Sequence, residues 1–284
     1  MALSIPYHLF QGQLQFGKGQ QNIDFELKSF GQYLNRLQEK GQLDFKLDVS
    51  SFLFDVGQGL YFDSTIPMGF GVGSSGALVA SVYDRYGRSK SSLQEGNDLD
   101  LSQLKRIFSQ MEGHFHGSSS GVDPLISYLD SAILVDGDGV LKLINTPQDS
   151  EGEGGLFLLN TGRPRKTEPL VNLFLEKLKN EDFKSHCEEK IIPITNYCIS
   201  SFIANDKETF WSNFRTLSEL QFESFNPMIP NLFKDLWISG LESDNFYLKL
   251  CGAGGGGFLL GLAKDLELAK KSLQNHEIRP VLRF

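Results

Sequence analysis

The chain has few cysteines, no long apolar run and no surplus of positive charge. Its three cysteines, Cys187, Cys198 and Cys251, form no C-x-x-C pair and are odd in number. They exclude a disulfide framework and fit a reducing compartment. No apolar stretch approaches the roughly 20 residues that span a bilayer, and the first residues carry no signal-peptide pattern. We therefore expect a cytoplasmic protein without a membrane partner.

Basic residues are in the minority, with 27 Lys and Arg against 35 Asp and Glu and a formal net charge of −8. A protein of this charge lacks the broad cationic surface that binds a phosphate backbone, so no nucleic-acid partner is expected. A small anionic ligand remains compatible, because a few backbone N–H groups at a helix start bind phosphate inside an acidic protein.

The chain is rich in apolar residues in mixed patterns. Apolar residues make up 40% of the 284 positions and 23 of them are Phe, which suffices for one large domain or two of ordinary size. The patterns predict strands near 3–10, 13–16, 44–49, 52–55, 60–66, 132–135, 140–144, 156–160, 246–250, 258–262 and 278–284. They predict helices at 30–38, 75–86, 101–112 and 265–274, with several more between 168 and 236. Strands and helices do not alternate regularly, which predicts the α+β class. A break rich in Pro, Asp, Glu and Gly at 146–155 predicts two domains, 1–150 and 151–284.

A first glycine-rich loop begins at Pro67 and reads Pro-Met-Gly-Phe-Gly-Val-Gly-Ser-Ser-Gly. Glycines allow positive φ and turn backbone N–H groups inward, and the positive end of the following helix adds to a phosphate cradle. A turn capped by serines is the plainer alternative, but three alternate glycines followed by two serines favour phosphate binding. The loop is not a Walker A sequence, because no Gly-Lys-Ser/Thr follows. The candidate phosphate-binding residues are Gly69, Gly71, Val72, Gly73, Ser74, Ser75 and Gly76.

A second loop, at 252–257, holds five glycines in six residues and formally matches G-x-G-x-x-G. A dinucleotide site needs a strand before the loop and a helix after it, whereas apolar strand patterns lie on both sides here. The remaining alternatives are a flexible hairpin and a backbone wall against a ligand. The entropic cost of five glycines favours the wall.

Glu112 and Asp123 lie at the ends of a Gly/Ser-rich segment that also carries His114 and His116. Magnesium-assisted phosphoryl transfer needs carboxylate or hydroxyl oxygens on the metal and a group near the attacking hydroxyl. An Asp in such a loop is more often a turn or cap residue, so only the neighbouring glycine loop makes this pair a candidate site. The two histidines lack a third zinc ligand and are predicted to face solvent or pack against the loop.

Two segments of the N-terminal half resemble motifs of the GHMP kinases. Residues 67–77 are similar to the family's phosphate loop P-x-G-x-G-L-G-S-S-A-A, with Val72 for Leu and Gly76 for the first Ala. Residues 116–123 resemble H-G-x-P-S-G-x-D of the mevalonate kinases within that family, with Ser119 in place of Pro.

Two further segments of the C-terminal half complete the resemblance. Residues 249–257 match the motif K-L-T-G-A-G-G-G-G except at Cys251. Residues 160–167 look like N-T-x-x-P-R-x-T, although an ordinary solvated loop with Thr167 as a helix cap explains them equally well in isolation. Four motifs in family order over residues 3–284 make the chain most similar to the mevalonate kinases.

The resemblance implies a two-domain fold and a role for each matching residue. The fold would be a ribosomal S5-like, ATP-binding N-terminal domain and a ferredoxin-like C-terminal domain, with the site between them. The implied roles are catalytic for Asp123 and Thr167, metal-binding for Ser75 and Glu112, phosphate-loop neighbour for Ser74, and substrate-side wall for Ala253 and Gly254.

One family motif, K-x-x-L-x-G-E-H or similar, has no counterpart here, because the chain begins almost at the segment that follows it, residues 3–6. Its Lys lies beside the catalytic Asp in the family. Without that cation the pKa of Asp123 would rise and charge stabilisation would weaken, and a missing strand would expose a sheet edge. We therefore expect this chain to be weakly active or inactive.

The expected reaction is direct transfer of the γ-phosphate of ATP, with Mg²⁺, to the hydroxyl of a small alcohol, for which the resemblance indicates mevalonate. One alternative is another GHMP kinase, such as a phosphomevalonate or sugar kinase. A phosphorylated substrate would need extra cations around the site. Arg163, Arg165 and Lys166 form the only such cluster near a motif, and they fit either kind of substrate. The other alternative is a nucleotide-binding protein without catalysis. A homodimer is compatible with each of these.

Overall fold

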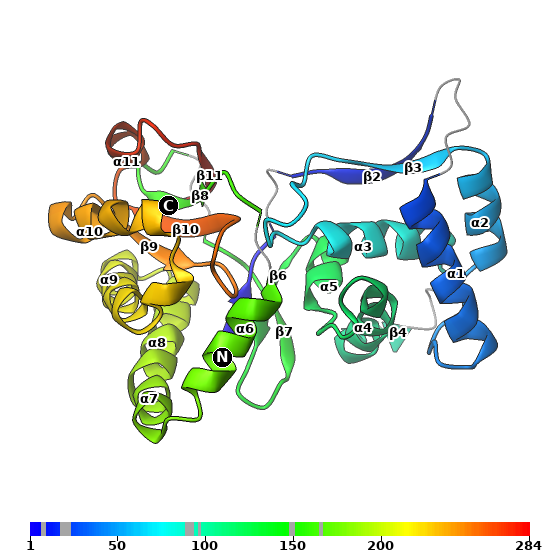
Figure 1. The fold of residues 1–284 in the computed structure, drawn as a ribbon, viewed down its shortest axis with the longest axis horizontal. Helices are drawn as coiled ribbons and strands as arrows, with labels where there is room; N and C mark the ends of the chain where they lie inside the picture. The colour runs from blue at the N-terminus through cyan, green and yellow to red at the C-terminus, as the bar shows by residue number, and fades with distance from the viewer. Residues whose placement is uncertain (7–9, 18–23, 89–93, 96–97, 148–150, 165–166) are drawn as a thin grey trace.

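The computed structural model describes residues 1–6, 10–17, 24–88, 94–95, 98–147, 151–164 and 167–284. Helices and strands are mixed without regular alternation, as the α+β prediction requires. Figure 1 shows two groups of elements, one containing α1 to α5 and the other α6 to α11, with β6 and β7 between them.

The first group holds a helical core covered by a two-stranded ribbon. Its core runs along the chain from Leu27 to Leu141, with Phe30, Phe52 and Phe108 wholly or almost wholly buried. Its elements are β2 (Gly12–Phe16), α1 (Phe25–Glu39), α2 (Val49–Gly57), β3 (Leu60–Ser64), α3 (Ser74–Tyr86), β4 (Gln94–Glu95), β5 (Asp98–Leu99), α4 (Leu101–His116) and α5 (Val122–Leu129). β2 pairs antiparallel with β3, and β4 with β5.

A three-stranded antiparallel sheet in the order β1-β6-β7 lies between the two groups. It consists of β1 (Ala2–Ser4), β6 (Ala132–Val135) and β7 (Leu141–Ile144). The β6–β7 hairpin was expected from its Asp-Gly turn, and Asp136 stabilises that turn by accepting the N–H groups of Asp138 and Val140 at 3.1 and 2.9 Å. The predicted hairpin is confirmed.

The second group is built on a four-stranded antiparallel sheet in the order β11-β8-β10-β9. Five consecutive residues of β8, from Gly155, are buried, as the continuous apolar pattern predicted for a strand covered on both faces. The strands are β8 (Gly155–Asn160), β9 (Phe246–Leu250), β10 (Phe258–Ala263) and β11 (Ile278–Arg283). The helices are α6 (Thr167–Lys177), α7 (Glu181–His186), α8 (Ile192–Ile203), α9 (Lys207–Ser224), α10 (Lys234–Ser243) and α11 (Leu266–Ser272), with a π-helical turn at Cys187–Ile191 and 3₁₀ turns at Asn226–Met228 and Asn231–Phe233. Within the ranges the structure describes, no helix has the length and apolar content needed to cross a membrane.

The prediction of a strand at 52–55 is wrong, because these residues lie in helix α2. Asp48 caps this helix by accepting the N–H of Ser51 at 3.2 Å. Val49, Phe52 and Val56 are buried on one face, at the three- and four-residue spacing of a helix. The predicted strand at 44–49 is likewise reduced to a single bridge between Leu47 and Gly87.

The apolar cores support a division of the chain into two domains. One core cluster ends at Leu141, and the other two clusters run from Leu156 onward. We propose that these are the cores of domains 1–150 and 151–284. The N-terminal strand contacts both, since β1 pairs with β6 while Leu3 and Ile5 pack against the cluster formed by α8 and α9.

Candidate active site

The first glycine loop leads from β3 into the start of helix α3. Gly69, Gly71 and Gly73 all have positive φ, between 70° and 79°. Gly73 is the N-cap and has no side chain that could accept the first N–H groups, so Ser74 and Ser75 are the first helical residues rather than caps. The plainer alternative of a serine-capped turn is therefore wrong. Uncapped N–H groups at a helix start are a suitable site for a phosphate group.

Asp123 lies directly beside this loop, in the first turn of α5 rather than in a loop. A Cβ placed on Gly73 would be 3.8 Å from the Cβ of Asp123. A Cβ on Gly76 would be 2.8 Å from the nitrogen of Pro124 and 2.9 Å from the carbonyl carbon of Asp123. Asp123 is thus fixed at the first glycine loop by close backbone packing of α5 on α3.

Replacing Gly76 with Ala is expected to destabilise the protein by about 1–3 kcal/mol, since the neighbouring atoms are backbone and must move to admit a methyl group. The free energy of unfolding in urea measures this. Gly57→Ala is the matched control, because nothing lies within 4 Å of a Cβ there. A Gly76→Ala protein as stable as the control would contradict the close packing of α5 on α3.

Glu112 is a buried carboxylate held by two serine hydroxyls. It is only 3% exposed. Ser75 donates to its Oε1 at 2.9 Å, and Ser119 donates to its Oε2. Burial raises the pKa of Glu112 above its ordinary value and the nearby charge of Asp123 raises it further, while the two serine hydrogen bonds lower it. The predicted residues Ser75, Glu112 and Asp123 therefore form one electrostatic cluster.

His116 belongs to the same cluster and was missed by the sequence reasoning. Its side chain is exposed, as predicted, but its Nε2 lies 3.0 Å from the Oγ of Ser75. The available signal was its spacing, because His116 follows Glu112 by four residues on α4 and so shares its face. His114 instead packs against the rings of Phe30 and Tyr33, and burial lowers the pKa of its imidazole.

The second glycine loop connects β9 to β10 and packs against the first glycine loop. A Cβ on Gly257 would be 2.2 Å from the carbonyl oxygen of Phe70, and the N–H of Gly257 donates to the carbonyl of Arg163 at 2.7 Å. The strand–loop–strand context is confirmed. The two loops therefore lie side by side and belong to one candidate site.

The predicted residues of the substrate-side wall and of the 160–167 segment are only partly placed at the site. Cys251 and Gly252 line the adjoining cavity, whereas Ala253 and Gly254 are not among its lining residues. Gly254 is buried against the carbonyl of Met228. Thr167 is the first residue of α6, but its side chain and residues 165–166 lie outside what the structure describes.

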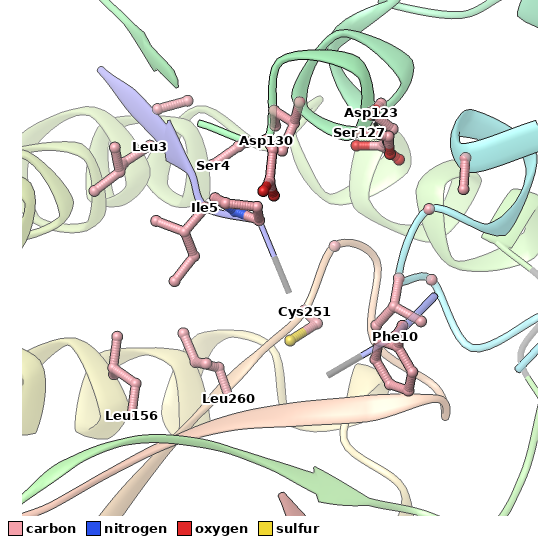
Figure 2. A pocket seen from close by; sticks show the side chains of 18 of the residues that line it. Leu3, Ser4, Ile5, Phe10, Asp123, Ser127, Asp130, Leu156, Cys251 and Leu260 are labelled. Atoms are coloured by element: carbon pink, nitrogen blue, oxygen red, sulfur yellow. Dashed lines mark hydrogen bonds between the residues drawn. The ribbon is translucent and has the colours of Figure 1, made fainter. Parts of the chain in front are cut away.

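A cavity of about 1080 Å³ opens beside the two loops. Gly71, Val72, Gly73 and Asp123 are among its lining residues, whereas Ser75 and Glu112 are not. Figure 2 shows the carboxylates of Asp123 and Asp130 on one side of this space, with Cys251 and Leu260 on the other. This volume is large enough for a small-molecule ligand.

A helix start lined with glycines, an aspartate beside it and a buried carboxylate–serine pair lie together in this α+β fold. Residues 33–131 match the family model described as the GHMP kinases N terminal domain. The resemblance to the GHMP kinases is confirmed, and the chain has the α+β fold of that family.

Particular relatives are mevalonate and phosphomevalonate kinases. The chain is 23% identical over 226 residues to mevalonate kinase of Dictyostelium discoideum, covering 71% of this chain and 57% of that protein, which is less than two thirds of the relative's length. L. major mevalonate kinase, solved with R-mevalonate, has a TM-score of 0.61 at 15% identity, covering 96% of this chain and 87% of that one. Streptococcus pneumoniae phosphomevalonate kinase, solved with phosphomevalonate and AMPPNP, has a TM-score of 0.58 at 15% identity, covering 96% and 90%. At these identities the two structures show a shared fold.

Proposed function

We propose that this chain is a small-molecule kinase that transfers the γ-phosphate of ATP to an alcohol, and that the alcohol is mevalonate. The observation that carries the proposal is the position of Asp123, which lies at the uncapped start of α3 and acts electrostatically on Glu112. Two relatives are mevalonate kinases, and one of the solved neighbours holds AMPPNP with its substrate. A cytoplasmic location and a homodimer remain predictions.

Magnesium fits the residues present at this site. The Oγ of Ser75 and Oε1 of Glu112 are 2.9 Å apart, and both are the hard oxygen donors that Mg²⁺ prefers. Among the residues that the structure describes, no group of three or more His, Cys, Asp or Glu side chains could hold a metal ion. A single carboxylate is sufficient for Mg²⁺ when substrate phosphates complete its coordination. Bound there, Mg²⁺ would neutralise phosphate charge.

The residues of the chain itself would position the reactants. The first N–H groups of α3 would bind phosphate oxygens, with the helix dipole favouring negative charge. Asp123, fixed beside Gly73, would orient the acceptor hydroxyl and receive its proton as the new phosphate ester forms. The contact between Gly257 and Phe70 would keep the two loops closed around the reacting groups.

The test is ADP release by the purified chain with Mg·ATP and, in turn, mevalonate, phosphomevalonate and galactose, followed by identification of the product by mass spectrometry. Mevalonate-dependent ADP with phosphomevalonate as the product supports the proposal. Turnover of phosphomevalonate or galactose alone supports the alternative GHMP kinases. Nucleotide binding without ADP release from any acceptor overturns the proposal in favour of a binding protein without catalysis.

A further inference from the structure

Lys249 is a cation on the wall of the cavity that the proposed mechanism does not use. It lies on β9, directly opposite Leu260 of β10, and both residues line the cavity. Neighbouring strand residues point to opposite faces. Leu248 and Leu250 pack in one core cluster, whereas Tyr247 packs in the cluster formed by α8 and α9. Lys249 therefore lies on the face of the sheet that α8 and α9 cover. Residues of α8 and α9 also line the cavity.

The charge of Lys249 has little compensation from the protein. Its side chain is half-buried, and its Nζ donates to the neutral carbonyl of Leu250 at 2.9 Å. Within the described part of the chain, no carboxylate lies within ion-pair distance of this ammonium group. Its electrostatic neighbour is the thiol of Cys198, whose pKa is raised by burial to about 12 and lowered somewhat by Lys249. An ammonium group with two N–H donors left over is a ready partner for an anion.

The surroundings of Lys249 specify the kind of anion. Lys249 is the one Lys or Arg side chain among the described residues that line the cavity. The wall near it is apolar and is formed by Leu156, Cys198, Ile199, Phe202, Phe214, Leu217 and Leu260. The α3–α5 wall, in contrast, carries Asp84, Asp123 and Asp130. An anionic group on the β9–β10 side of the cavity is attracted to Lys249.

We infer that Lys249 is the specificity-determining residue of the acceptor site and binds a single carboxylate attached to a short apolar body. This inference rests on the proposed function, whose acceptor mevalonate is a hydroxy acid, and it adds the residue that binds the carboxylate of that acid. With the carboxylate at Lys249, the hydroxyl of the acid is directed to the side of Asp123. The single charge of a carboxylate matches the charge of the Lys249 ammonium group.

Equilibrium binding to the full chain in the presence of Mg·AMPPNP tests the inference without requiring turnover. By calorimetry, mevalonate is expected to bind at least about tenfold more tightly than the neutral mevalonolactone. Lys249→Met is expected to weaken mevalonate binding about 10- to 100-fold, the range for a hydrogen-bonded charge, and to remove the preference over the lactone. Lys249→Arg is expected to keep most of the affinity. Lys264→Met is the matched control, because Lys264 is exposed and stacks on Trp211 outside the cavity.

Unchanged mevalonate affinity in a folded Lys249→Met protein would overturn the inference. Lactone binding as tight as mevalonate binding, or no mevalonate binding to the natural sequence, would overturn it as well. A parallel ADP assay separates the two proposals. Turnover with a KM insensitive to Lys249 overturns the inference and leaves the kinase proposal standing. Binding that depends on Lys249 without ADP release from any acceptor supports the carboxylate site and overturns the kinase.

Discussion

Asp123→Asn is expected to lower phosphate transfer about 10³-fold while nucleotide affinity stays within about threefold of the original. In the proposed mechanism the lost carboxylate orients the acceptor hydroxyl and takes its proton, a contribution of about 10²–10⁴-fold. Asn has nearly the same shape, so the packing of α5 on α3 through Gly76 and Pro124 is retained. Measurement of kcat by ADP release, with the dissociation constant of AMPPNP alongside, separates chemistry from binding.

Asp138→Asn is the control for this substitution. Asp138 is exposed in the β6–β7 turn, and the turn is stabilised by Asp136 rather than by the side chain of Asp138. Its ADP release should equal that of the natural sequence. A full rate in the Asp123→Asn protein would remove Asp123 from the mechanism and leave only positioning by the two glycine loops.

Glu112→Gln is expected to reduce phosphate transfer roughly 100-fold at millimolar Mg²⁺ and to raise the Mg²⁺ concentration needed for half-maximal rate. The amide keeps the shape of the side chain and can still meet Ser75, but it lacks the negative charge that binds a hard cation. Titration of Mg²⁺ at saturating ATP gives the shift directly. An unchanged Mg²⁺ requirement would show that the metal binds without this carboxylate.

The same variant should be at least as stable as the natural sequence at pH 8 in the absence of metal. Because the pKa of Glu112 is raised on folding, the folded state binds its proton more tightly than the unfolded state. Ionising this buried group costs stability, and the full cost is present at pH values above the pKa of Glu112 in the folded protein. The cost disappears as the pH falls from that pKa to the ordinary pKa of Glu in the unfolded chain. Thermal melts of both proteins from pH 8 to pH 4 should therefore show the advantage of Glu112→Gln shrinking with acidity. An advantage that grows with acidity would contradict the raised pKa.

The two glycine loops were predictable because their physical requirement is local. Positive φ at Gly69, Gly71 and Gly73 is encoded at each position, and the strands on both sides of the second loop are apolar enough to exclude a dinucleotide site. Helix α2 was not predictable in this way, because its short apolar pattern at 52–55 fits both the spacing of a helix and that of a strand. Only the capping hydrogen bond of Asp48 distinguishes the two.

The residues that surround Glu112 come together through tertiary contacts, and their spacing in the sequence predicts only some of these contacts. The link from Ser75 to Glu112 joins α3 to α4 across 37 positions. Ser119 replaces the family's Pro, and its hydroxyl supplies a second hydrogen bond to the same carboxylate. In the sequence Lys249 is only the first residue of the motif at 249–257, and the apolar and acidic cavity walls around it are assembled by the fold.

The contacts of Ser75 also fix where hydrogen atoms reside. A serine hydroxyl has one hydrogen, and here it is directed to Glu112. With that carboxylate ionised, the approach of His116 at 3.0 Å is a hydrogen bond only if its Nε2 carries the hydrogen. The neutral ring is then the Nε2–H tautomer, with Nδ1 left as the acceptor. A cation that binds the Ser75 oxygen would compete with this N–H for the same lone pairs, so metal binding and the tautomer of His116 become linked.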